Sequence, residues 1–271
     1  MNVSELHKIA EGREAEIFEW EGGTVLRLMR SNYGLESVEL QARALRAAHD
    51  AGVTVPIPGD TTIVEGRHGL VMERIDGPDL LTLLGNKPWH IWSAGKTAGR
   101  LQASLHEVVA PEGLPNLKAS LQQGIESSDR VPAAEAKFAL EMLADLPDGD
   151  RLCHGDFHPG NIIQAKDRDV VIDWSNVVVG DPAADLARSR LLIRMGEPPP
   201  GAPFLVRTMA VVGRGALGVA IRRGYRQQRA VDEDLVRRWE VPVMAHRLTE
   251  YIEEERPKLL KLLKERLQEH S

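Results

Sequence analysis

Two polar loops, each following a short apolar strand, carry the residues of this chain that are best suited to chemistry. The first lies in LCHGDFHPGNII, residues 152–163, and presents the carboxylate of Asp156 and, five residues later, the carboxamide of Asn161. The second follows the apolar residues 170–172 and begins with the carboxylate of Asp173. Glycine and proline in the first loop favour tight turns, and loops held by flanking strands are common places for reacting groups.

Together these three side chains suit the transfer of a phosphoryl group. The charge on the transferred group has to be neutralised, usually by Mg²⁺ held by oxygen ligands, and we expect Asn161 and Asp173 to be those ligands. A hydroxyl that attacks phosphorus needs a carboxylate to orient it and to accept its proton, which suits Asp156. The residues therefore predict a Mg²⁺-dependent transfer of a phosphoryl group to a hydroxyl.

The motif HGDFHPGN, followed by VIDW and then GDPAADLA, is similar to the catalytic-loop and metal-loop signature of the aminoglycoside phosphotransferase family, which includes choline-kinase-like enzymes and other antibiotic kinases. The resemblance runs from about residue 10 to about residue 187. It implies an α+β, bilobal protein-kinase-like fold, with ATP and Mg²⁺ as cofactors. It also implies a small-molecule hydroxyl as acceptor; aminoglycoside-like compounds, other antibiotics and metabolite alcohols all stay open.

The other polar residues of these motifs have supporting roles in our interpretation. His154 is expected to be a hydrogen-bonded loop histidine. His158 either braces the loop or contacts substrate, and the spacing does not separate these two roles. Asp181 and Asp185 are expected to brace loops or to cap the following helix, since aspartate is favoured at helix N-caps.

The resemblance also places the nucleotide on the N-terminal part of the chain. Residues 9–17 look like the loop that covers the phosphates in this family, and Arg27 stands where such kinases carry a phosphate-contacting lysine. Arginine keeps the charge but is longer and forked. We expect its acidic partner to be Glu39, with Glu36 second, although the family-like register falls closer to Gln41. Met72, Glu73 and Ile75 resemble the hinge that would hold the adenine.

Hydrophobic patterns predict the elements that must position these residues. Residues 17–21 and 24–29 read as a hairpin around Gly22 and Gly23, residues 35–51 as a helix, and residues 61–65 and 69–74 as two further strands. From residue 76 onward the pattern becomes helical, with short strands at 151–153 and 170–172 and a break at Pro198-Pro199-Pro200. We therefore expect an N-terminal nucleotide-binding lobe at 1–75 and a catalytic and acceptor-binding lobe at 76–271, with a cleft between them.

The composition excludes several classes of protein. The 271 residues carry a formal net charge of -6, which argues against a nucleic-acid binder, and the single cysteine, Cys153, excludes an intrachain disulfide. No secretory signal and no apolar run of membrane-spanning length is present, so we expect a cytoplasmic protein that binds no membrane. The basic last helix is expected to dock on the protein through its leucines. The oligomeric state cannot be read from the sequence.

Three rival interpretations are weaker. Gly95-Lys96-Thr97 ends like a P-loop but lacks the required upstream glycine. Residues 213–218 match a dinucleotide-binding fingerprint, but the alternating strands and helices that this fold needs are not predicted around them. We therefore expect the glycines of 213–218 to allow close helix packing. A protein kinase would need a longer segment between Asp173 and Asp181. A catalytically weak or inactive nucleotide-binding protein on a kinase-like fold is the alternative that stays open.

Overall fold

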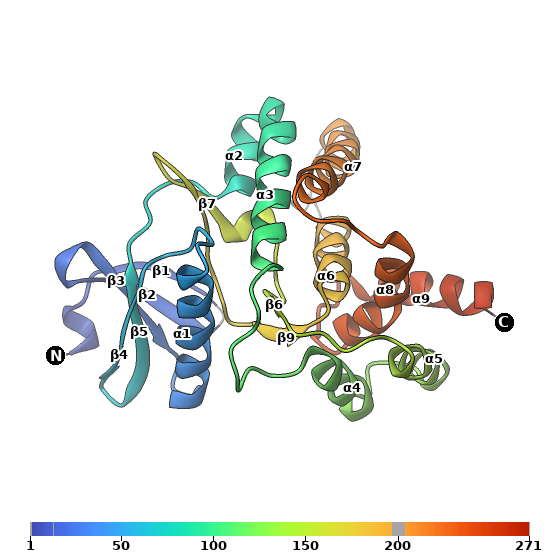
Figure 1. The fold of residues 1–271 in the computed structure, drawn as a ribbon, viewed down its shortest axis with the longest axis horizontal. Helices are drawn as coiled ribbons and strands as arrows, with labels where there is room; N and C mark the ends of the chain where they lie inside the picture. Colours follow the sequence, from blue (N-terminus) through green and yellow to red (C-terminus); the bar gives the residue numbers. More distant parts are fainter. Residues whose placement is uncertain (1, 13, 197–203, 271) are drawn as a thin grey trace.

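The computed structural model describes residues 2–12, 14–196 and 204–270, with backbone only for 204–211 and residue 270. A β-sheet with one helix forms one end of the molecule, and helices form most of the rest (Figure 1). The two termini lie at opposite ends of the long axis. The strand-rich N-terminal part and the helical C-terminal part confirm the predicted α+β, protein-kinase-like fold.

The N-terminal sheet has five antiparallel strands in the order β1-β2-β3-β5-β4. They are β1 (Lys8–Glu11), β2 (Ala15–Trp20), β3 (Thr24–Met29), β4 (Pro58–Val64) and β5 (Arg67–Glu73). Helix α1 (Leu35–Asp50) packs on this sheet, and its buried Leu45 belongs to the same apolar cluster as Met29 and Leu70. The predicted helix at 35–51 is confirmed.

The hairpin between β2 and β3 forms where the two glycines predicted it. A short 3₁₀ turn at Glu21–Gly23 joins the strands, and both Gly22 (φ 66°) and Gly23 (φ 76°) are left-handed, a conformation that glycine adopts without steric cost. The strand β1 was not in the predicted series of two strands, a helix and two strands. All four of its residues are exposed, so no apolar alternation marks it in the sequence.

The C-terminal part is mainly helical, with two small two-stranded sheets, β6 with β9 and β7 with β8. It contains short 3₁₀ turns at Pro88–His90 and Pro159–Asn161, and a third such turn, Val3–Glu5, precedes β1. Its helices and strands are α2 (Leu80–Asn86), α3 (Ile91–Leu105), α4 (Leu117–Ser127), α5 (Ala133–Ala144), β6 (Arg151–Cys153), β7 (Ile162–Gln164), β8 (Asp169–Val171), β9 (Val178–Gly180), α6 (Pro182–Met195), α7 (Phe204–Arg226), α8 (Glu233–Leu248) and α9 (Arg256–His270).

The predicted strands at 151–153 and 170–172 are present within one residue, as β6 and β8. Their pairing partners, β9 and β7, were not among the predicted strands. The predicted break at Pro198-Pro199-Pro200 lies outside the described residues.

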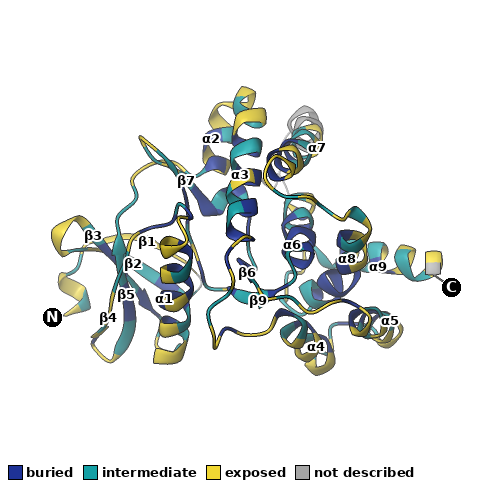
Figure 2. Ribbon diagram, in the orientation of Figure 1, coloured by how far each residue is buried: buried dark blue, intermediate teal, exposed yellow. Residues whose placement is uncertain are grey.

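The apolar core joins the two parts of the molecule. One buried cluster contains residues of the sheet and α1 together with Leu152, Phe157 and Ile162, which flank or lie within the first polar loop. A second cluster holds α4, α5, α6, α8 and α9 together, and the buried faces of these helices point inward (Figure 2). The loop that carries Asp156 is therefore anchored in the core between the sheet and the helices.

The last helix docks on the protein, as its leucines predicted. Leu259 and Leu263 of α9 are almost fully buried and belong to the same cluster as Trp239 of α8. Within the described residues, every helix is too short or too polar to cross a membrane.

Candidate active site

Antiparallel pairing of β7 with β8 brings the two polar loops to one place. Ile162 pairs with Val171, and the backbone N–H of Ile172 donates to the carbonyl of Asn161 over 2.9 Å. Asn161 therefore stands immediately before one strand, and Asp173 stands two residues beyond the end of its partner. Because the strands run in opposite directions, these two positions lie at the same end of the pair.

The Asn161 side chain ties Asp156 to this end of the hairpin. Its Nδ2 donates to the backbone carbonyl of Asp156 over 2.9 Å and approaches Oδ2 of the same residue at 3.4 Å. Both contacts use Nδ2, so Oδ1 is the Asn161 atom that could bind a cation. The structure thus brings together the three residues that sequence spacing singled out.

His154 is a buried support of the loop, as expected. Its Nε2 lies 3.0 Å from the carbonyl of Ile172, and its Nδ1 accepts the backbone N–H of Asp156 over 3.3 Å. A carbonyl requires a donor and an N–H requires an acceptor, so these two partners select the neutral tautomer with the proton on Nε2. Through these two hydrogen bonds, the buried His154 side chain connects the two polar loops.

His158 also braces the loop, which favours one of its two predicted roles. Its Nδ1 accepts the backbone N–H of Gly160 over 3.0 Å and caps the 3₁₀ turn that leads to Asn161. Its Nε2 lies 3.8 Å from Oδ2 of Asp156. Burial lowers the pKa of His158, so the imidazole is neutral near pH 7.

Asp173 has a left-handed backbone conformation at the start of the second polar loop. Its φ of 61° is left-handed, which is uncommon for residues other than glycine, asparagine and aspartate. Oδ1 accepts hydrogen bonds from the Ser175 hydroxyl and, over 3.3 Å, from Nη2 of Arg27. Burial would raise the pKa of Asp173, but the Arg27 charge and the Ser175 hydroxyl outweigh it and keep the pKa below its ordinary value. The group is a carboxylate at neutral pH.

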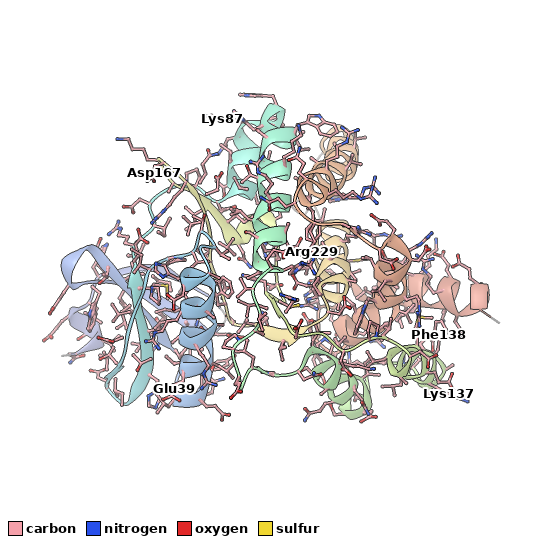
Figure 3. The ribbon with its side chains drawn as sticks, in the orientation of Figure 1. Glu39, Lys87, Lys137, Phe138, Asp167 and Arg229 are labelled. Atoms are coloured by element: carbon pink, nitrogen blue, oxygen red, sulfur yellow. The ribbon has the colours of Figure 1, made fainter. Side chains whose placement is uncertain are left out.

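Arg27 does not form the ion pair with Glu39 that we predicted, nor with Glu36. Its Nη1 donates to Oε1 of Gln41 over 2.6 Å, and its Nη2 donates to the Ser175 hydroxyl over 2.8 Å. Glu39 is exposed on α1 (Figure 3), whereas Gln41 is buried against the sheet. Side chains two positions apart on an α-helix point in directions about 200° apart, so Glu39 and Gln41 cannot face the same side. The residue that the family-like register favoured is the one that Arg27 contacts.

One cavity of about 930 Å³ contains most of the predicted site. Its lining includes Asp156, Asp173 and Arg27, and all three predicted hinge residues, Met72, Glu73 and Ile75. Parts of the segment 9–17 also line it, but this segment is not one loop as predicted, because Ile9 to Glu11 belong to β1 and Ala15 to Ile17 belong to β2. Glu73 is held by the backbone N–H of Ile57 and by an ion pair with Arg168. Asn161 lies behind Asp156 and is 8% exposed, and Glu39 lies outside the cavity.

Arg188 and Glu250 belong to this cavity and were missed from the sequence. Arg188 donates through Nε to the carbonyl of Gly155 over 3.0 Å, and its Nη2 lies 4.0 Å from Oδ1 of Asp156. It also forms an ion pair with Glu250, which accepts from Arg247 over 2.5 Å. Burial would raise the pKa of Glu250, but these two guanidinium groups lower it overall. Arg188 lies three residues after Asp185 on α6, so both are on the same helix face, and this spacing could have indicated that Arg188 belongs to the site. No neighbouring motif in the sequence indicates a role for Glu250.

Asp181 and Asp185 support the site from α6, as predicted. Asp181 is the N-cap of the helix, where its Oδ1 accepts the N–H of Ala183 over 2.7 Å. Asp185 is 1% exposed; its Oδ1 accepts the N–H of Gly155 over 2.8 Å, and its Oδ2 accepts from His106 and Gln102. Burial would raise the pKa of Asp185, but the hydrogen bond and charge of His106 lead the effects that lower it to about 2.

We expect Asp185→Asn to destabilise the fold by about 3 kcal/mol at neutral pH, because the new amide N–H₂ would face groups that themselves donate. The depressed pKa stabilises the folded state above the ordinary pKa near 4, and this contribution, about 2 kcal/mol, is lost as pH falls toward 2. The difference between wild type and variant should therefore shrink between pH 6 and pH 3 in urea unfolding. Asp181→Asn is the control, since asparagine caps helices as well as aspartate does. A pH-independent difference would show that the carboxylate charge is not what stabilises the loop.

The donor set fits a small, hard cation. Within the described residues, no group of three or more histidine, cysteine, aspartate or glutamate side chains could form an all-protein metal site. Mg²⁺ is usually held by one or two carboxylate or amide oxygens, with substrate phosphates and water completing its shell. Asp173 and Oδ1 of Asn161 supply that number and type of ligand. The chemistry of these residues therefore fits Mg²⁺ bound together with a phosphorylated ligand.

Comparisons with known proteins agree with this geometry. The model of the family described as "Phosphotransferase enzyme family" matches residues 5–230. No curated protein sequence is significantly similar to the chain. Among solved structures, the amicoumacin kinase hAmiN, in complex with AMP-PNP, Ca²⁺ and Ami, is similar with a TM-score of 0.68 at 14% identity, over 99% of this chain and 89% of that one.

Two further structures show the same fold. A thermostable mutant of aminoglycoside phosphotransferase APH(4)-Ia, in a ternary complex with AMP-PNP and hygromycin B, has a TM-score of 0.63 at 16% identity, over 98% of this chain and 92% of that one. Choline kinase from Cryptosporidium parvum Iowa II has a TM-score of 0.59 at 14% identity, over 98% of this chain and 90% of that one. At these identities the likeness shows the fold.

Proposed function

Because this chain belongs to the phosphotransferase enzyme family, we propose that it transfers the γ-phosphate of ATP, with Mg²⁺, to a hydroxyl group of a small molecule. The observation that carries the proposal is the meeting of Asp156, Asn161 and Asp173 at one end of the β7–β8 hairpin, with Arg27 in contact with Asp173. We further propose residues 1–75 as the nucleotide-binding lobe, residues 76–271 as the catalytic and acceptor-binding lobe, and a cytoplasmic location.

The nucleotide would occupy the part of the cavity next to the sheet. The backbone of the segment that contains Met72, Glu73 and Ile75 would hold the adenine, and Arg27 would bind phosphate oxygens. Gln41 is neutral, so it orients the Arg27 guanidinium without cancelling its charge. Asn161 and Asp173 would hold Mg²⁺, which when bound neutralises charge on the phosphates.

The acceptor hydroxyl would lie against Asp156. The Asp156 carboxylate orients this hydroxyl and accepts its proton as the oxygen attacks phosphorus. Arg188 holds the carbonyl of Gly155 and keeps the loop in position, while Asp185 holds the N–H of the same residue from the other side. The loop that presents the base is therefore fixed before any ligand binds, which favours catalysis by positioning.

The acceptor end of the cavity is formed by α4 and α8. Leu117 and Leu121 supply apolar surface there, and Glu250 supplies a carboxylate that two arginines already neutralise. This lining suits a compound with both apolar and polar faces better than a highly charged one. Solved relatives are complexes with hygromycin B and with Ami, which supports testing antibiotic and metabolite alcohols first.

A direct test follows ADP formation with a panel of hydroxyl compounds, with Mg²⁺ and with EDTA. We expect at least one compound to raise ADP formation above the acceptor-free rate, and only with Mg²⁺. AMP-PNP should also bind more tightly with Mg²⁺ than without it. If no compound stimulates the reaction and Mg²⁺ leaves nucleotide affinity unchanged, the chain is the inactive nucleotide-binding protein that remains the alternative.

We expect Arg27→Lys to lower kcat/KM for ATP about 10- to 100-fold. A lysine ammonium cannot keep the forked contacts to Gln41, Ser175 and Asp173, and each charge-assisted hydrogen bond contributes about 1.5–3 kcal/mol. The control is Arg46→Lys, since Arg46 on α1 donates to the carbonyl of Gly59 and neither residue lines the cavity. Equal kcat/KM in the two variants would remove Arg27 from the phosphate site.

A further inference from the structure

A second cavity, of about 400 Å³, lies on another face of α6. Helix α6 lines the active-site cavity with Asp185 and Arg188, and it lines the second cavity with Ser189, Ile193 and neighbouring residues. Helix α7 forms the facing wall. The two cavities therefore share a helix without sharing any lining residue among those that the structure describes.

The second cavity is strongly basic, although the chain carries a net charge of -6. Five cationic side chains and no acidic one are among its described lining residues: Arg190, Arg194, Arg214, Arg222 and Lys258. Arg190 is neutralised by an ion pair with Glu233, which also attracts Arg222; within the described part of the chain, neither Arg194 nor Arg222 lies within ion-pair distance of a carboxylate. Such clustering of cations costs free energy unless an anion offsets it.

Two glycines of α7 leave the cavity open. A Cβ atom added at Gly215 or Gly218 would meet nothing within 4 Å, whereas one added at Gly224 would lie 2.1 Å from the carbonyl of Lys96. The expectation that the glycines of 213–218 permit close helix packing is therefore wrong for Gly215 and Gly218; Gly224 of α7 and Gly99 of α3 perform that role. Glycine inside a helix costs about 1 kcal/mol relative to alanine, so two glycines that contact nothing need another explanation.

A buried, unsatisfied hydrogen-bond acceptor lies next to the cavity. Gln102 is fully buried, and its Nε2 donates to Asp185 and to Ser189. Because carboxylate Oδ2 must accept, the amide orientation is fixed, and Oε1 is left with no partner among the described residues. A buried acceptor without a donor costs about 1–3 kcal/mol, and this oxygen is itself covered, so only a shift of the Gln102 side chain would bring it to the cavity surface.

We propose that this second cavity is a binding site for a small organic anion. The ligand carries a phosphate, sulfonate or carboxylate group for Arg194 and Arg222, and an apolar body that lies over Gly215, Gly218 and Ile221. The proposed anion site takes no part in phosphoryl transfer, so this proposal does not depend on which acceptor receives the phosphate.

The test uses 8-anilino-1-naphthalenesulfonate, an anion with an apolar body, as a fluorescent probe in the presence of excess AMP-PNP and Mg²⁺. We expect one bound probe per chain, displaced by phenyl phosphate and not by benzyl alcohol, and weakened by salt. Gly218→Leu fills the cavity and strengthens the helix, so it should lower probe affinity at least about tenfold without loss of stability. The double variant Arg194→Gln/Arg222→Gln should lower it to a similar extent.

Gly85→Leu is the matched control, because Gly85 also lies in a helix with open space beside it, but on α2 and away from the cavity. It should bind the probe as the wild type does. Binding that survives Gly218→Leu, displacement by benzyl alcohol as effective as by phenyl phosphate, or a wild type that binds no probe would each overturn the proposal.

Discussion

Asp156→Asn lowers the rate of phosphoryl transfer by about 10²- to 10⁴-fold and leaves nucleotide affinity nearly unchanged, because a carboxamide cannot accept the proton of the attacking hydroxyl. The substitution is close to isosteric. Asn161 bonds mainly to the backbone carbonyl of Asp156, which the variant keeps, and His154 still accepts the backbone N–H. The loss would therefore report on chemistry and not on loop structure.

The measurement is single-turnover formation of ADP, with an acceptor identified from the hydroxyl panel, alongside AMP-PNP binding with Mg²⁺. The control is Asp167→Asn, which makes the same chemical change at the connection between β7 and β8, outside the cavity (Figure 3). If Asp156→Asn turns over as fast as Asp167→Asn, then Asp156 is not the base and the mechanism proposed above fails.

The three central residues could be predicted because their geometry is set locally. Asp156 and Asn161 are five residues apart in a loop that a proline and two glycines restrict, and the apolar residues on either side enter the core. Asp173 follows the next such strand. Short antiparallel strands close together in the chain pair with one another, so sequence proximity was enough to place all three residues at one end.

Contacts between distant segments could not be predicted in the same way. Arg27 lies on a strand and Gln41 on a helix, and which helix face meets the strand depends on a rotation that sequence fixes only to within a residue or two. Arg188 and Glu250 are separated by 62 positions, and their pair exists because the end of α8 returns to α6. Buried polar networks of this kind are decided by tertiary packing.

The same reasoning explains which elements were found. Helix α1 has a long apolar stripe and was predicted to within one residue, whereas β1 is exposed along its length and is defined by pairing with β2 alone. Backbone hydrogen bonding leaves no trace in the side-chain pattern. An element that is stabilised by burying apolar side chains can be predicted from the sequence pattern. An exposed edge strand that is held by backbone hydrogen bonds to its neighbour cannot be predicted in this way.

Asp173→Asn is the cleanest way to remove the metal-binding charge. The residue is left-handed, with a φ of 61°, and asparagine is the residue other than glycine that tolerates this conformation best. Its Oδ1 can still accept from Ser175 and Arg27, so the contacts survive and only the negative charge is lost. Alanine at this position would add backbone strain and confuse the result.

We expect Asp173→Asn to abolish the strengthening of AMP-PNP binding by Mg²⁺ and to lower turnover by about 10²- to 10³-fold, since the charge that develops on the phosphates would no longer be neutralised. Titration calorimetry with MgCl₂ and with EDTA measures the first effect separately from the second. Ser175→Ala is the matched control: it removes a neutral hydroxyl that bonds to both Asp173 and Arg27, and it should keep the Mg²⁺ effect. Mg²⁺-dependent binding that persists in Asp173→Asn would place the cation on other ligands, and the pairing of Asp173 with Asn161 as its holders would be wrong.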